Sequence, residues 1–175
     1  MEVVADIETD GLDPSLIWVL VCREVDNPEN VHTFIRPDLN PQPLIDYARD
    51  VSLWIGHYFL GFDARVLNRL VPGFRIDPRS VLDTVVVSRL LNYNRKGGHS
   101  VENLAESFGE KKVGKDITDW SVYTDEMHDR CVNDTLVQLK IYQSQKKYLQ
   151  MEEFRRAVRT EHDLEILAHK LHDNG

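Results

Sequence analysis

Three apolar segments of strand length follow one another within the first 36 residues, and this order constrains the possible folds more than any other feature of the chain. Turn-rich stretches separate the three segments, which predicts a meander. Helix-like and strand-like segments then alternate. Strands followed by such alternation predict an α/β fold, a mixed five-stranded sheet with helices on both faces. The predicted strands are Glu2–Ile7, Leu16–Arg23, Val31–Arg36, Val51–Gly56 and Val81–Leu82.

The remaining apolar segments have the spacing of helices. The longest predicted helix starts after Thr124, a favourable N-cap that two acidic residues follow. Residues 110–123 are polar and irregular in pattern. The predicted helices are Pro41–Asp50, Asp63–Val71, one that begins at Thr84, one with Ser100 as N-cap, Val101, Leu104, Ala105 and Phe108 on one stripe and Gly109 as its end, Thr124–Tyr148, and a last one within Met151–Gly175.

Two carboxylates, Asp6 and Glu8, end the first apolar segment and lie two residues apart. Side chains alternate in direction along a strand, so both carboxylates emerge on one face. Close anions resist joint ionisation unless a cation lies between them, and a divalent metal is the usual cation. Asp63 and Asp134 also lie beside apolar segments, so four carboxylates from three segments are available for two ions. A solvent-exposed strand end is the alternative explanation for the Asp-x-Glu pair.

In this order and spacing the motifs resemble those of the DEDD superfamily of 3′-to-5′ exonucleases. Asp6-x-Glu8 is similar to the first motif, Phe62-Asp63 to the second, and Asp134 on its helix to the third. The stretches from Leu82 to Leu90 and from His99 to Leu104 resemble those of proofreading domains in family-A DNA polymerases, particularly the polymerases of short-tailed bacteriophages. The resemblance implies an RNase H-like fold, an exonuclease domain at residues 1–150, and a helix at 151–175 that resembles the first thumb helix of such polymerases.

The resemblance also implies a reaction. The expected activity is metal-dependent removal of 3′-terminal nucleotides from single-stranded or frayed DNA as 5′-monophosphates. Two Mg²⁺ ions, with Mn²⁺ as a substitute, would clamp the scissile phosphate. Asp6 would bridge both ions, Glu8 and Asp134 would complete the ion that activates water, and Asp63 would hold the other. The implied partners are a single-stranded DNA 3′ end and a family-A polymerase domain in the same or a partner chain.

The resemblance further assigns residues to the substrate. Thr9, Gly11 and Leu12 match the loop that receives the terminal nucleotide in this family, although an ordinary turn explains them as well. Asp83 matches an Asp that the family places near the metal ligands, and capping of the following helix is the alternative. Tyr58 stands where such polymerases generally have Asn, and it would stack on a base instead.

A second departure from the family pattern concerns the attacking water. The family usually has Tyr four residues before the third-motif Asp, or His five before it, and this chain has Arg130 and Asp129. At about 100° per residue, Arg130 lies roughly 40° from Asp134 on the helix and His128 roughly 120° away. We therefore expect Arg130 to face the site and to pair with a carboxylate, contact the phosphate or steady the water. Guanidinium stays protonated, so Arg130 is no base.

Two other functions remain open at this point. One is an RNase D-like exonuclease that trims RNA 3′ ends. The other is a weakly active or inactive exonuclease fold that binds strands, which Arg130 and Tyr58 favour. Four crowded anions argue against the inactive fold.

The formal net charge of −8 argues against extended duplex binding, because phosphate contacts normally come from Lys and Arg. An enzyme that grips one strand end can take much of its positive field from metal ions. Arg95-Lys96 and Lys111-Lys112 with Lys115 are local basic clusters that either contact the strand or form solvated loops. The longest apolar run, Leu16–Cys22, is too short to span a bilayer, so we expect a protein of the cytoplasm, the host's if phage-encoded.

Overall fold

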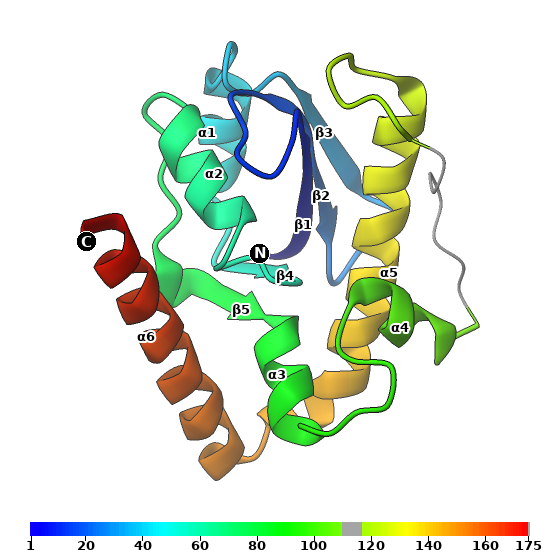
Figure 1. Ribbon diagram of the computed structural model, residues 1–175, viewed down its shortest axis with the longest axis vertical. Helices are drawn as coiled ribbons and strands as arrows, with labels where there is room; N and C mark the ends of the chain where they lie inside the picture. Colours follow the sequence, from blue (N-terminus) through cyan, green and yellow to red (C-terminus); the bar gives the residue numbers. More distant parts are fainter. Residues whose placement is uncertain (110–116, 175) are drawn as a thin grey trace.

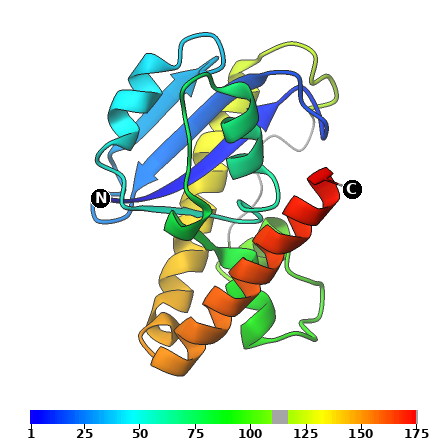
Figure 2. The ribbon, with the colours of Figure 1, turned by 90° about the vertical axis from the view of Figure 1, so that its left-hand side faces the viewer.

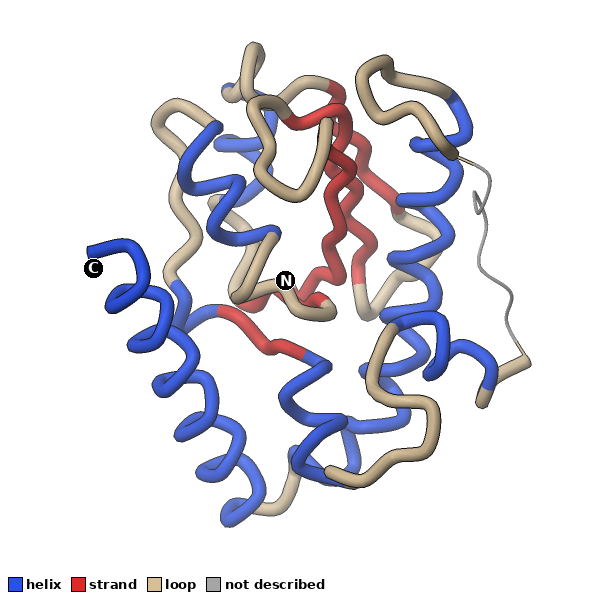
Figure 3. The backbone as a smooth tube through the Cα atoms, viewed as in Figure 1, coloured by secondary structure: helices blue, strands red, loops and turns tan. Residues whose placement is uncertain are grey.

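The computed structural model describes residues 1–109 and 117–174, and its centre is one mixed five-stranded sheet with helices on both faces (Figure 1). The strand order across the sheet is β3-β2-β1-β4-β5. Figure 3 shows the strands between the helices. The predicted fold class is confirmed. The strands are β1 (Glu2–Thr9), β2 (Ile17–Glu24), β3 (Val31–Ile35), β4 (Leu53–Gly56) and β5 (Val81–Asp83).

The first strand, β1, occupies the middle of the sheet. It pairs antiparallel with β2, which pairs antiparallel with β3, and it pairs in parallel with β4, which pairs in parallel with β5. The register places Asp6 opposite Val21 and Glu8 opposite Val19 on β2, with an irregularity between Glu8 and Thr9. Because β1 and β4 are parallel, the ends of both strands meet at one edge of the sheet.

The helices divide between the two faces of the sheet. Val3 and Ala5 of β1 pack in one cluster with Leu44 of α1 (Gln42–Ala48) and Leu67 of α2 (Asp63–Leu70), whereas Val4 packs on the other face with Leu139 of α5 (Asp125–Leu149). Side chains of β1 alternate between the two faces and are buried on both, so the strand contributes to two cores. The helices are α1 (Gln42–Ala48), α2 (Asp63–Leu70), α3 (Thr84–Leu91), α4 (Val101–Glu106), α5 (Asp125–Leu149) and α6 (Glu152–Asn174), with a short 3₁₀ turn at Pro78–Ser80.

The long helix α5 begins and ends close to the predicted residues. The Thr124 side chain accepts a hydrogen bond from the Met127 N–H, and Asp125 and Glu126 occupy the first turn. The helix runs beside β1 and β2, and α6 then crosses the end of the sheet where β5 lies (Figures 1 and 2). A helix of 25 residues is long enough to present both Asp134 and a separate packing surface for α6.

Several element boundaries differ from the prediction by one to three residues, and one short element was not predicted. Helix α4 ends at Glu106, because the Phe108 N–H bonds the Ala105 carbonyl three residues back and the tightened turn takes Phe108 off the apolar stripe. Phe108 is 38% exposed. Strand β4 begins at Leu53, because the Val51 N–H still bonds the Ala48 carbonyl of a helix-terminal turn. The 3₁₀ turn at Pro78–Ser80 was not predicted.

Both cysteines, Cys22 and Cys131, are free thiols and fully buried. Lys111, Lys112 and Lys115 lie outside the described residues. Within the described part of the chain, no helix combines the length and the apolar character needed to cross a membrane.

Candidate active site

Three of the four predicted metal ligands form one cluster. One oxygen each from Asp6, Glu8 and Asp134 lies within 4.8 Å of the others. Asp6 and Glu8 project from the face of β1 that α5 covers, and Asp134 projects from α5 toward them. Val19 and Val21 pack against Cys131 on the same face, and this contact sets the position of α5 over the strand ends. The local cause of the cluster is therefore strand alternation on β1 and apolar packing of α5.

The fourth predicted ligand, Asp63, contacts β1 from helix α2. It is the first residue of α2 and is buried, and its Oδ1 accepts a hydrogen bond of 3.1 Å from the Ile7 N–H. Ile7 lies between Asp6 and Glu8 in the chain. Asp63 is not one of the three residues of the close cluster, but its carboxylate lies beside the same segment of β1.

The carboxylates are held in a setting that disfavours their charge. Burial raises the pKa of Asp6 to about 7, the charge of Asp134 adds to this, and a hydrogen bond from Gln138 opposes it. Burial and the charge of Asp6 raise the pKa of Asp63 well above its usual range. Anions in such a setting gain most from a cation, and three hard oxygen donors within one small space suit Mg²⁺ or Mn²⁺. The residues present therefore fit a divalent cation.

Two neighbours of Asp6 were missed in the sequence. Gln138 Nε2 donates to Asp6 Oδ1 at 2.7 Å, and the buried Cys131 Sγ donates to the Asp6 carbonyl at 3.2 Å and to Oδ2 at 3.5 Å. Both residues belong to α5. Cys131 precedes Asp134 by three residues and Gln138 follows it by four, so the three side chains share one helix face. This spacing was the signal in the sequence that could have indicated both neighbours of Asp6. Together they orient Asp6 before any metal binds.

Arg130 lies against the cluster, and its expected orientation is confirmed. Its Nε is 3.1 Å from Glu8 Oε1 and 3.7 Å from Asp134 Oδ2, and its guanidinium stacks 5.1 Å from the centre of the Trp120 ring. His128 points elsewhere, because its Nε2 is hydrogen-bonded to Thr33 Oγ1 of β3 at 3.0 Å. The residue that occupies the position of the family's Tyr is thus a cation bound to two predicted metal ligands.

The predicted nucleotide loop lies at the end of β1. Thr9 Oγ1 donates to the Gly11 carbonyl at 2.8 Å, and Leu12 is 95% exposed. Leu12 and Tyr58 line one groove of about 820 Å³. The groove is next to Phe62, the residue before Asp63. An exposed apolar side chain and an aromatic ring at its rim provide the kind of surface on which a base stacks.

The backbone of Tyr58 has a conformation that Asn adopts more readily than Tyr does. Its φ of 61° lies in the left-handed region, which Asn tolerates and which costs other residues with a Cβ roughly 1–2 kcal/mol. The strain persists because Asp83 fixes the segment: its Oδ1 accepts a hydrogen bond of 2.9 Å from the Tyr58 N–H.

We expect Tyr58→Asn to raise the free energy of unfolding by about 0.5–1 kcal/mol, because Asn relieves part of this backbone strain. Urea denaturation of the two proteins measures the difference. Tyr93→Asn is the matched control, since Tyr93 is exposed and has no positive φ, and it should give no gain. A loss of stability in Tyr58→Asn would show that the ring contributes more than the backbone costs.

The structure gives Asp83, which was predicted to contact the substrate, the capping role that the sequence left as the alternative. Asp83 is fully buried, and its carboxylate accepts hydrogen bonds from the N–H groups of Tyr58, Leu60 and Val85 at 2.9–3.1 Å. It therefore caps α3 and closes the loop after β4. The alternative of helix capping holds. His57 also has a structural role, because its ring bonds Thr84 Oγ1 and the His99 carbonyl.

Replacing Asp83 by Ala should lower the free energy of unfolding by about 3 kcal/mol, since three backbone N–H groups lose their acceptor in a buried place. Asp77→Ala is a matched control, because Asp77 is exposed and accepts one hydrogen bond from the Arg79 N–H at the 3₁₀ turn. The control should cost no more than about 1 kcal/mol. If chemical denaturation shows equal losses of unfolding free energy in Asp83→Ala and Asp77→Ala, the role assigned to Asp83 is contradicted.

Comparison with known proteins agrees with this geometry. A family model described as 3′-5′ exonuclease matches residues 2–150. The chain belongs to this 3′-5′ exonuclease family. Brucella melitensis NrnC has a similar structure, with a TM-score of 0.73 at 18% identity over 99% of this chain and 86% of that chain. A search of curated proteins gave no significant match.

Two further solved structures share the fold of this exonuclease. Escherichia coli RNase D, an exoribonuclease involved in structured RNA processing, has a TM-score of 0.70 at 18% identity over 95% of this chain and 44% of that chain. The family B DNA polymerase of Pyrobaculum calidifontis has a TM-score of 0.59 at 18% identity over 85% of this chain and 25% of that chain. At these identities the likeness shows the fold alone, and the RNase H-like architecture predicted from the sequence is confirmed. The family match ends at residue 150, beside the end of α5.

Proposed function

We propose that the exonuclease removes nucleotides one at a time from the 3′ end of single-stranded or frayed DNA and releases 5′-monophosphates. The observation that carries the proposal is the close cluster of Asp6, Glu8 and Asp134, with Asp63 bonded to β1 beside it. Membership of the 3′-5′ exonuclease family gives the direction of the reaction. The choice of DNA rests on the motifs that resemble proofreading domains.

In this mechanism the chain's own residues position the reacting groups. Asp6, Glu8, Asp134 and Asp63 would hold two Mg²⁺ or Mn²⁺ ions, which supply an activated water and stabilise the leaving 3′ oxygen when bound. Gln138 and Cys131 orient Asp6. Leu12 stacks against the terminal base, and the Gly11 backbone lies near the terminal sugar.

Arg130 has a proposed role of its own in this reaction. Its guanidinium lies between Glu8 and the Trp120 ring, beside the carboxylates that would hold the metal ions, and we propose that it contacts the scissile phosphate there. A guanidinium there stabilises the charge that develops on the phosphate oxygens but accepts no proton. The proton of the attacking water then leaves to solvent.

A partner domain is also part of the proposal. Leu164, Leu167 and Leu171 of α6 are each more than half exposed, and they follow one another at helical spacing. A helix face of this kind normally packs against another element. We propose that a family-A polymerase domain, in the same or a partner chain, covers it, and that the 151–175 segment is the start of that domain.

RNA is the second candidate substrate. The fold is shared with RNase D and with NrnC, for which one structure has pGG bound. At 18% and 19% sequence identity, both likenesses are informative about the fold alone. RNA 3′ ends are therefore an alternative substrate for the same site.

The test is degradation of 5′-labelled DNA and RNA oligonucleotides with Mg²⁺, with Mn²⁺ or with chelator. We expect stepwise shortening of DNA that needs metal and that is lost in Asp63→Asn, which keeps the size of the side chain. Asp50→Asn is the control: it changes an exposed carboxylate that belongs to neither the cluster nor its neighbours, and it should retain activity. Shortening of RNA alone would favour the alternative, and no shortening of either substrate with either metal would overturn the proposal.

A further inference from the structure

Two hollows lie along α6, outside the carboxylate cluster. The groove that Leu12 and Tyr58 line continues between α2 and the end of α6, and a cavity of about 500 Å³ lies between the first half of α6, β5 and the end of α5. Pro78 and Ile166 line both, so the two hollows meet at these residues. Together they form one depression, which we call the α6 track.

Positive charge is concentrated in the α6 track although the chain as a whole is acidic. Eight of the 21 lysines and arginines line it, whereas only three of the 29 acidic residues do. The track therefore carries a formal charge of +5, and the rest of the chain carries −13. The basic residues of the track are Arg65, Arg69, Arg75 and Lys170 in the groove and Arg79, Arg155, Arg156 and Arg159 in the cavity.

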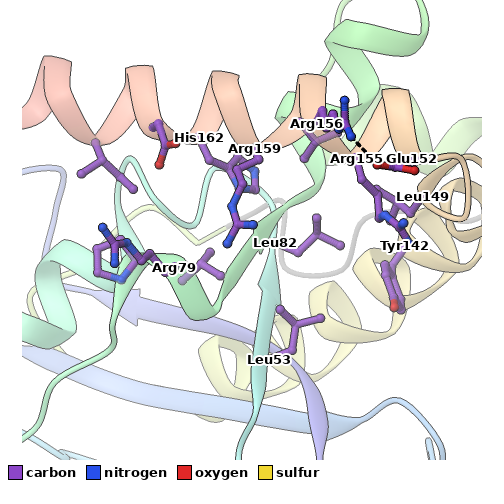
Figure 4. Close-up of a pocket in the computed structure, with 15 residues that line it drawn as sticks. Leu53, Arg79, Leu82, Tyr142, Leu149, Glu152, Arg155, Arg156, Arg159 and His162 are labelled. Carbon is purple, nitrogen blue, oxygen red and sulfur yellow. Dashed lines mark hydrogen bonds and ion pairs between the residues drawn. The ribbon is translucent and has the colours of Figure 1, made fainter.

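The basic side chains stand over an apolar floor. In the cavity, Arg159 extends from α6 toward Leu82, and Tyr142 and Leu149 lie on its other side (Figure 4). In the groove, Arg65 Nη1 is 3.1 Å from His169 Nδ1, a contact that joins α2 to α6. Alternation of cations with apolar and aromatic surface is the arrangement that holds a single strand, phosphates on the cations and bases on the apolar surface.

The dimensions of the track suit several nucleotides. From Arg155 to Lys170 the helix rises by about 22 Å. At the 3.4 Å phosphate spacing of one stacked strand this corresponds to about six nucleotides. The groove end of the track starts at Leu12 and Tyr58, where the terminal nucleotide is expected, so a strand could continue from the carboxylates into the track.

We propose that the α6 track binds the sugar-phosphate backbone of a single nucleic-acid strand upstream of its 3′ end. The polarity of the bound strand, with its 3′ end at the carboxylates, rests on the proposed function. Strand length then matters for affinity, and the enzyme holds longer oligonucleotides more tightly than short ones. Arg95 and Lys96, which line neither hollow, do not contribute.

The test is binding in chelator, where no hydrolysis occurs, by fluorescence anisotropy of 5′-labelled oligo-dT and oligo-rU of 3, 6 and 12 nucleotides. We expect affinity to rise at least about tenfold from 3 to 6 nucleotides and to change little beyond that. The double variant Arg75→Gln/Arg159→Gln should remove most of this gain. It should also reduce the slope of log affinity against log salt by about 1.4, or about 0.7 for each phosphate that the variant no longer neutralises.

Arg49→Gln/Arg95→Gln is the matched control, because it removes the same charge from residues outside the track. The proposal is overturned if the control weakens binding as much as the track variant does, if affinity is independent of strand length, or if an acidic peptide of equal charge binds the track as tightly as oligo-dT. If binding depends on strand length but no metal-dependent shortening occurs, the proposal for the α6 track is supported and the proposed function is contradicted. If shortening occurs but binding does not depend on strand length, the proposed function is supported and the proposal for the α6 track is contradicted.

Discussion

Asp134→Asn should lower the rate of 3′-terminal hydrolysis by at least about a thousandfold, which corresponds to about 4 kcal/mol of lost transition-state stabilisation. The substitution keeps the shape of the side chain but removes one of three charged oxygen donors that lie within 4.8 Å of one another. An amide oxygen is a weaker ligand for a hard divalent ion. The measurement is the single-turnover rate on a 5′-labelled oligonucleotide with saturating Mg²⁺.

Asp129→Asn is the control for this variant. It makes the same chemical change on the same helix at a side chain that is 74% exposed, and it should leave the rate within about twofold. Stability separates a lost ligand from a damaged fold. Since the charge of Asp134 helps to raise the pKa of Asp6, the chelator-treated variant should unfold at no lower a temperature than the wild type. A variant that keeps more than a tenth of the wild-type rate would contradict the role assigned to Asp134.

Arg130→Gln should bind Mn²⁺ at least about tenfold more tightly than the wild type. The guanidinium Nε lies 3.1 Å from Glu8 and 3.7 Å from Asp134, so it neutralises carboxylates that an ion would otherwise use. Coulomb attraction at this range is worth up to about 4 kcal/mol in a partly screened site, and tenfold tighter binding needs only about 1.4 kcal/mol of it. Calorimetric titration with Mn²⁺ measures the change without relying on turnover.

The same substitution should destabilise the metal-free protein by about 1–3 kcal/mol, because it removes the guanidinium that pairs with two buried carboxylates. Mn²⁺ should restore this loss. Arg36→Gln is a close control, since Arg36 also pairs with a carboxylate, Asp38 at 2.8 Å, and stacks over a tryptophan, Trp18. Metal affinity should not change in the control. Weaker Mn²⁺ binding in Arg130→Gln would mean that Arg130 helps to assemble the site instead of competing for it.

The sequence predicted those parts of the site that depend on local geometry. Strand alternation put Asp6 and Glu8 on one face, and the angle between successive residues of a helix put Arg130 on the side of Asp134. The contacts of Cys131 and Gln138 with Asp6 depend on where α5 crosses β1, which is a result of packing between distant segments. Local patterns carry no information on such a crossing.

Two other features could not be predicted from the sequence, for related reasons. The burial of Asp83 depends on the loop after β4 folding back over β5, so a carboxylate that looked available is enclosed by three backbone amides. The α6 track combines residues of α2 and α6 that lie about a hundred positions apart. Neither Arg65 nor Lys170 belongs to a basic run in the sequence, and their charges add only because the helices are neighbours.

The central place of β1 in the sheet has a consequence for how the enzyme loses its metal. It pairs with β2 along most of its length and with β4 at Glu2–Val4, so its amides should be among the slowest of the chain to exchange with deuterium, at a rate set by global unfolding. Helix α5 is held to the sheet by side-chain packing and side-chain hydrogen bonds and not by a backbone ladder, so we expect it to detach before the strands separate. Partial melting would thus separate Asp134 from a still intact Asp6 and Glu8, and the ion would leave before the sheet comes apart.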